Sequence, residues 1–184
     1  MPRWPWRAEQ ANGSKTDSIV AQLPREDATP TIDGACEKPQ EDGAGVIAPV
    51  TLLRVAEALE KLDIRYLTDG DGSLLALWER HAVLFALEGP SDEILVIRAR
   101  PHATVPPDWS DRAYRVINEW NHTRRFYKAY VADPTDRGQL PIYAEMQVPL
   151  LSGVHDALIA ELVDCAAVVA LGFVDWLHDE GALL

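Results

Sequence analysis

The sequence predicts an α+β fold, in which helices pack against an antiparallel sheet of five to six strands. Three observations predict this class. An amphipathic helical pattern opens the globular part of the chain near residue 49, short strands separated by turn signals follow it, and a long apolar helical pattern ends it. The expected element order is α-β-β-β(β)-α-β-β-α.

Length and charge limit the class of protein. The 184 residues, 47% of them hydrophobic, suffice for one domain of ordinary size and a tail. The formal net charge of −12 argues against nucleic acid or an anionic membrane as the main partner. The sequence has no secretory signal pattern and no run of about 18 apolar residues. We therefore expect a cytoplasmic protein that does not span a membrane.

Residues 1–48 are predicted to be a disordered tail. Gly, Ser, Pro and acidic residues are scattered there without a period, so the segment cannot bury enough apolar surface to offset its ordering entropy. Trp4, Pro5 and Trp6 are the exception, because this short aromatic stretch could bind a partner. Cys36 and Cys165 fall in different parts of the chain, so we expect no structural disulfide. The globular domain is assigned to residues 49–184.

The first half of this domain reads as one helix and a run of strands. Apolar residues recur at intervals of three and four from Leu52 to Leu62, which predicts an amphipathic helix of about four turns with Pro49 near its start. Asp69-Gly70-Asp71-Gly72 begins like a calcium loop, but Arg80 occupies the position of the bidentate glutamate, so we interpret it as a hairpin turn. The predicted strands are residues 64–67, 74–79, 82–88 and 93–99.

The second half predicts a helix, two strands and a final long helix. Asp108 or Ser110 is expected to cap a helix that stops near Arg125. Strands are predicted at residues 128–132 and 139–148, and the last helix from about residue 153 to 179. The inner stripe of that last helix is predicted to be Val154, Leu158, Leu162, Ala166, Val169, Phe173 and Leu177.

The last helix is apolar all round between Cys165 and Val174. An apolar stretch of this kind must be covered by protein, either deep in its own domain or against a second copy. We favour a second copy, because a small sheet has little with which to wrap both sides of a terminal helix. The predicted dimer-interface residues are Val169, Phe173 and Trp176.

The helix around Trp120 carries the most informative polar residues. Asn118 and Asn121 lie three residues apart and therefore share a helical face. Buried amides need partners, so we expect both to tie this helix to a neighbouring strand or loop. Arg124 follows and is expected to reach an acidic group on a partner or on a second subunit.

Motifs for catalysis are missing from the sequence. No P-loop, dinucleotide-binding glycine motif, nucleophile elbow or His/Cys metal-ligand spacing occurs. We therefore expect no cofactor, no metal and no enzyme activity, although residues distant in sequence can still meet in space. Basic and aromatic residues mix between residues 124 and 130 as in single-strand nucleic-acid platforms, but the net charge disfavours that partner.

Several short runs together resemble a known family: residues 62–64, 69–72, 78–79, 117–121 and 153–156. They are similar to the YbjN-domain family of bacterial proteins, particularly its actinobacterial form, over about residues 49–178. The Asn-x-Trp-Asn helix is the most specific part. The resemblance implies a fold like that of the type III secretion chaperones, which are small α+β dimers, and a role as a sensory-transduction regulator.

Our leading hypothesis is a non-enzymatic adaptor or regulator that acts as a homodimer. It would bind an extended segment of an unidentified protein or peptide across its sheet or a helix–sheet groove. The candidate groove aromatics are Trp78, Trp120, Tyr130 and Tyr143, each with core packing as its alternative role. The alternative function is a small-ligand sensor or an enzyme with a pocket near the Asn118–Asn121 helix.

Overall fold

A computed structural model describes residues 45–184 of the chain. The predictions for residues 1–44, including the Trp4–Trp6 stretch and Cys36, lie outside the described residues. The α+β class and the element order are confirmed. The elements are α1 (Leu52–Lys61), β1 (Tyr66–Thr68), β2 (Leu74–Leu77), β3 (His81–Glu88), β4 (Ile94–Pro101), the 3₁₀ turn η1 (Pro107–Trp109), α2 (Ser110–Thr123), β5 (Lys128–Val131), β6 (Ile142–Pro149) and α3 (Asp156–His178).

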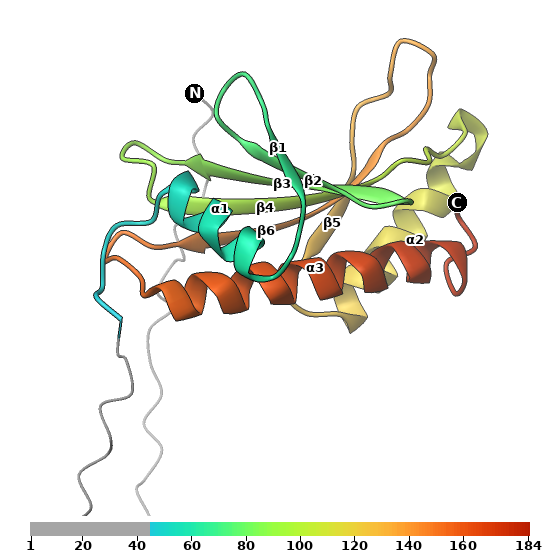
Figure 1. Cartoon of the computed structure of the whole chain (residues 1–184). Coiled ribbons are helices and arrows are strands. Elements are labelled where there is room, and N and C mark those ends of the chain that lie inside the picture. The colour runs from blue at the N-terminus through green and yellow to red at the C-terminus, as the bar shows by residue number, and fades with distance from the viewer. Residues whose placement is uncertain (1–44) are drawn as a thin grey trace, which may run out of the picture. The chain divides into compact units, whose positions relative to one another are not determined.

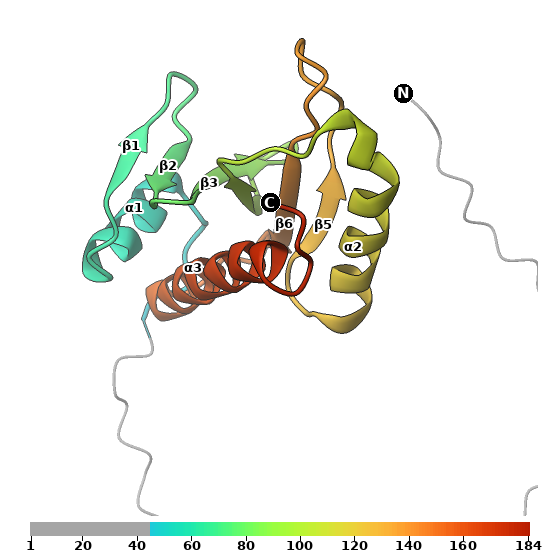
Figure 2. The same ribbon diagram turned by 90° about the vertical axis from the view of Figure 1, so that its right-hand side faces the viewer.

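The six strands form one antiparallel sheet in the order β1-β2-β3-β4-β6-β5. α1 and α3 lie on one face of the sheet, and α2 runs beside the edge strand β5 (Figures 1 and 2). The other face carries no helix in the described part of the chain (Figure 2). Side chains alternate along β3 and β6 between buried and partly exposed positions, as expected for a sheet with one covered face.

The helix starts differ from the predicted ones. Thr51 caps α1 by accepting a 3.3 Å hydrogen bond from the backbone of Arg54, so Pro49 lies before the helix. α1 has ten residues, which is under three turns rather than four. Neither Asp108 nor Ser110 caps α2, because η1 leads directly into the helix with no side-chain cap. The predicted hairpin turn is confirmed, with Gly72 at a φ of 90° that favours glycine.

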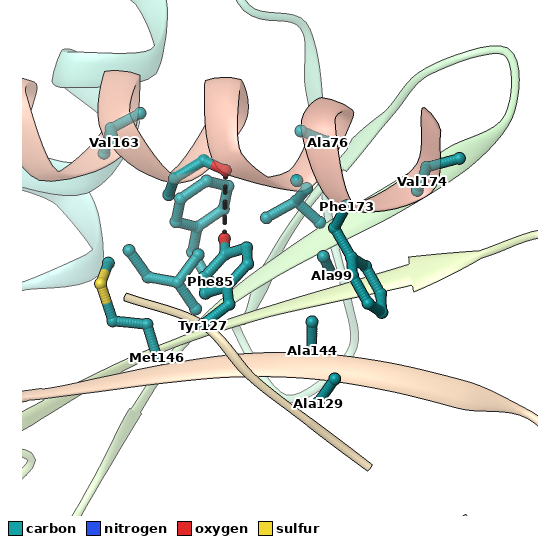
Figure 3. Packing of buried hydrophobic residues seen from close by; sticks show 14 of the residues in the cluster. Ala76, Phe85, Ala99, Tyr127, Ala129, Ala144, Met146, Val163, Phe173 and Val174 are labelled. Atoms are coloured by element: carbon teal, nitrogen blue, oxygen red, sulfur yellow. Dashed lines mark hydrogen bonds between the residues drawn. The ribbon is translucent and has the colours of Figure 1, made fainter. Parts of the chain in front are cut away.

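The core lies between the covered face of the sheet and the helices. Tyr127 is fully buried, and its hydroxyl donates a 3.2 Å hydrogen bond to the carbonyl of Ala166 on α3 (Figure 3). The stripe predicted for α3 is partly wrong, since Leu158 is 39% exposed and Val169 is half-buried. The buried residues of α3 are Ile159, Val163, Ala166, Ala170, Phe173, Val174, Trp176 and Leu177.

By length and composition alone, an 18-residue window of α3 is apolar enough to cross a membrane. The same is true of core helices in some globular proteins. Only 33% of that window is buried, although one face of α3 packs on the sheet. The core therefore explains the apolar inner face of α3 and leaves its apolar outer face unexplained.

Candidate protein-binding groove

Asn121 closes one edge of the sheet. Its Nδ2 donates to the carbonyl of Ala129 at 2.9 Å, and its Oδ1 accepts from the Ala129 backbone N–H at 2.8 Å. The amide thus replaces a neighbouring strand beside the edge strand β5, which confirms that Asn121 ties α2 to a strand. Asn118 is exposed and makes no side-chain hydrogen bond in the described part, so the partner predicted for it is wrong.

Trp120 anchors α2 to α3. It is 3% exposed, and its indole N–H donates to the carbonyl of Tyr127 at 3.3 Å. Its ring lies 4.8 Å edge-on from Phe173 and 5.5 Å from Trp176. Phe173, at 0% exposure, is therefore a core residue, and the prediction that it forms part of a dimer surface is wrong. Trp176 is 6% exposed, and its place at a dimer interface stays a prediction.

A groove of about 490 Å³ opens between the end of α2, the turn after it and the second half of α3. We call it the α2–α3 groove. It brings together four residues singled out from the sequence, Trp120, Arg124, Val169 and Trp176, whereas neither Asn118 nor Asn121 lines it. Its complete lining is Trp120, Arg124, Arg125, Phe126, Val168, Val169, Gly172, Asp175, Trp176, Asp179 and Glu180.

The charged residues of the α2–α3 groove belong to different elements according to sign. Arg124 and Arg125 follow α2, whereas the acids lie on or just after α3. Arg124 lies 3.5 Å from the carboxylate of Glu180 and 5.8 Å from the Trp120 ring centre. Within the chain it therefore reaches Glu180, and the acid predicted for it on a partner or second subunit stays a prediction. Both members of this pair are substantially exposed, so the pair contributes little to stability.

Phe126 stands at the mouth of this groove in a strained conformation. Its φ is 66°, and the Tyr127 N–H donates to the carbonyl of Arg125 at 2.9 Å, which makes a γ-turn of the rare, strained kind. The strain costs about 1–3 kcal/mol, which burial of Tyr127 offsets, while Phe126 remains 64% exposed. The sequence shows a phenylalanine here but not its backbone conformation, so Phe126 was considered only as part of the disfavoured nucleic-acid platform and was missed as a groove residue.

Gly172 leaves the floor of the groove open. A Cβ added there would meet no atom within 4 Å, so packing within the chain does not require glycine at this position. A glycine inside a helix costs about 0.5–1 kcal/mol relative to alanine. Two locally unfavourable features, Phe126 and Gly172, therefore line the same groove.

The remaining predicted aromatics lie elsewhere. Trp78, in the β2–β3 connection, stacks on His81 with ring centres 5.0 Å apart. Tyr130 and Tyr143 face each other across β5 and β6, with ring centres 5.6 Å apart. The sequence-derived residues thus divide between the α2–α3 groove and other parts of the sheet.

The described residues offer little for chemistry. They contain no group of three or more His, Cys, Asp or Glu side chains that could hold a metal ion. His81 is 1% exposed with neither ring nitrogen hydrogen-bonded, and burial lowers its pKa, which favours the neutral imidazole. Burial and nearby acids raise the pKa of the Cys165 thiol, which disfavours the reactive thiolate.

Comparison with known proteins agrees with the fold. No curated protein matches the chain. The crystal structure of YbjN from E. coli, described as a putative transcription regulator, matches with a TM-score of 0.61 and 13% identity, covering 73% of this chain and 97% of that one, which supports the fold alone. A family model, "YbjN: Putative bacterial sensory transduction regulator", matches residues 51–179. The chain therefore belongs to the YbjN family.

Proposed function

We propose that this chain is a non-enzymatic cytoplasmic regulator that binds protein and works as a homodimer joined through the outer face of α3. The family description supports a regulator. The adaptor role and the dimer rest on one observation, which is the exposed apolar surface around the α2–α3 groove. Val168 is 63% exposed and Leu171 is 51% exposed beside it. Contiguous apolar surface of this kind is typical of an interaction site.

The shape of this surface supports a second copy as its occupant. In a two-fold dimer the same patch meets itself, so a projection must find a hollow on the same surface. Phe126 is such a projection, and the groove beside Gly172 is the hollow.

The charges fit the same arrangement. Arg125 can face the partner's acidic side of the groove, while Asp179 faces the partner's basic side. Opposed charges at the rim guide association and fix the orientation of the subunits. A partner with a single sign of charge would meet repulsion on one side.

The experiment is sedimentation velocity on the full chain and on Val168→Glu. We expect a dimer for the wild type and a monomer for the variant, because the variant places a charge in the apolar contact. Leu67→Glu is the matched control, since Leu67 is 60% exposed on the other side of the sheet. Thermal melts establish that all three chains fold. A monomeric wild type at micromolar concentration, or a dimeric Val168→Glu, would contradict the proposal.

A small-ligand sensor is the second candidate. The volume of the α2–α3 groove, about 490 Å³, lies within the range of small-molecule sites. A metabolite that raises the Tm of the wild type but not of Gly172→Trp, which fills the groove, would support this function instead. A monomeric wild type together with such a metabolite would decide for the sensor.

A further inference from the structure

The helix-free face of the sheet carries a groove of its own, also of about 490 Å³. Leu75 and Leu77 of β2 and Leu84 of β3 line one side of it, and Arg98 and Arg100 of β4 line the other. We call it the sheet-face groove. It therefore places an apolar half beside a basic half on the face that no helix covers (Figure 2).

The strand register fixes the spacing between the two halves. Leu77 lies opposite Ala82, and Ala82 lies opposite Arg100, so these three residues form a row across β2, β3 and β4. Neighbouring strands are about 4.8 Å apart, which puts Leu77 and Arg100 about 10 Å apart. A ligand that uses both must present an apolar group and an anionic group at that separation.

The two arginines differ in how their charge is met. Arg98 lies against Glu145, with its Nε 2.5 Å from the carboxylate, and 3.9 Å from Glu88. Arg100 makes no ion pair with any described residue and is exposed, while its guanidinium lies 5.6 Å from the ring centre of Tyr143. Stacking of this kind holds a guanidinium in place. Arg100 is thus a positioned cation that no acid between residues 45 and 184 neutralises, in a chain whose net charge is −12.

The apolar side is wider than the groove itself. A second row of leucines runs from Leu84 through Leu75 to Leu67 on β1, the outermost strand. Leu67 is 60% exposed and Leu77 is 52% exposed. Three strand spacings separate β1 from β4, which is about 14 Å. That width suits a length of polypeptide better than a compact small molecule.

We propose that the sheet-face groove binds an apolar segment of a partner protein that places a carboxylate on Arg100 and an apolar side chain against Leu77 and its neighbours. This inference rests on the proposed protein-binding function and names the chemistry of the partner. Charge complementarity at Arg100 selects an acidic residue, and the leucines select its apolar neighbour. The partner meets the sheet side of the molecule, so both subunits of a dimer joined at α3 keep this groove free.

The test is selection of random 12-residue displayed peptides on three full-length baits: wild type, Arg100→Gln and Arg115→Gln. Arg115 is an exposed arginine on α2 with no ion pair among the described residues, so its variant makes the same charge change away from the groove. We expect wild type and Arg115→Gln to enrich peptides that combine an acidic and an apolar residue. Fluorescence anisotropy of the best peptide should show binding about tenfold weaker for Arg100→Gln and for Leu77→Ser. Replacing the acid of the peptide by its amide should have the same effect.

Peptides that bind Arg100→Gln as tightly as wild type would overturn the inference. If such peptides are lost with Gly172→Trp instead, the protein-binding function stands and its site is the α2–α3 groove. Failure to enrich any peptide would also overturn it, and sedimentation would decide the dimer separately. A monomeric Arg100→Gln would identify the occupant as a second copy and would overturn the inference. If decanoate displaces the peptide and no segment from protein digests binds, the ligand is a small carboxylate, and the inference is overturned as well.

Discussion

The two grooves have the same volume and differ in charge. The α2–α3 groove holds basic residues after α2 and acidic residues of α3, so its charges can be met by a second copy of the same surface. In the sheet-face groove no acid of the described residues pairs with Arg100, which fits the different, acidic partner proposed for it. Apolar lining alone does not distinguish the two surfaces. The balance of charge around each groove indicates which kind of partner it fits.

The two edges of the sheet differ in a similar way. At β5 the amide of Asn121 occupies the backbone groups of Ala129, and α2 covers the edge. At β1 no strand pairs on the outer side within the described residues. β1 has only three residues, which limits its use as a template for another chain. A partner is therefore expected on the face of the sheet rather than along either edge.

The largest loss of stability is expected from Trp120→Ala, which removes the contact between α2 and α3 beside the α2–α3 groove. The indole joins α2 to Phe173 and Trp176, so its loss should lower the free energy of unfolding by about 3–5 kcal/mol. Urea denaturation measures this. Tyr114→Ala, which truncates an aromatic that is 54% exposed on the same helix, should have a small effect. Equal losses for the two variants would show that Trp120 is not the anchor.

A smaller loss of stability is expected from Asn121→Ala, which removes the hydrogen bonds that Asn121 makes to the edge strand β5. The variant leaves the N–H and C=O of Ala129 without their partner and should lower the free energy of unfolding by about 1–3 kcal/mol. Asn118→Ala is the matched control on the same helix and should change it by less than about 0.5 kcal/mol. Hydrogen exchange at Ala129 should become faster only in Asn121→Ala. An unchanged exchange rate there would contradict the role of Asn121 as an edge closure.

Much of the fold could be predicted from the sequence because the signals are local. The alternation in β6 and the turn at Asp69–Gly72 depend on neighbouring residues and were correctly interpreted. The start of α2 was not, because η1 leads into the helix and replaces a side-chain cap. In α3 the apolar residues surround the helix, so periodicity placed the exposed Leu158 on the inner stripe and left out the buried Ile159.

The candidate sites were less predictable because they depend on pairing between distant segments. Asn118 and Asn121 look alike in sequence, but only Asn121 faces β5. Arg100 was not singled out from the sequence. Only the pairing of β4 with β6 shows that Glu145 binds Arg98 and that no described acid pairs with Arg100. The periodicity of two in β4 places Arg98 and Arg100 on one face and is the signal that could have found them.

The smallest effect is expected from Gly172→Ala, which tests whether the α2–α3 groove is kept open at the cost of stability. The added Cβ has no neighbour within 4 Å, so the variant should raise the free energy of unfolding of the monomer by about 0.5–1 kcal/mol. Urea denaturation in the monomeric Val168→Glu background measures this without a contribution from dimerisation. In the wild-type background the same methyl group should weaken the dimer, because it occupies the hollow that receives Phe126. A variant that destabilises the monomer would show that Gly172 serves the fold, and one that leaves the dimer unchanged would place the subunit contact elsewhere on α3.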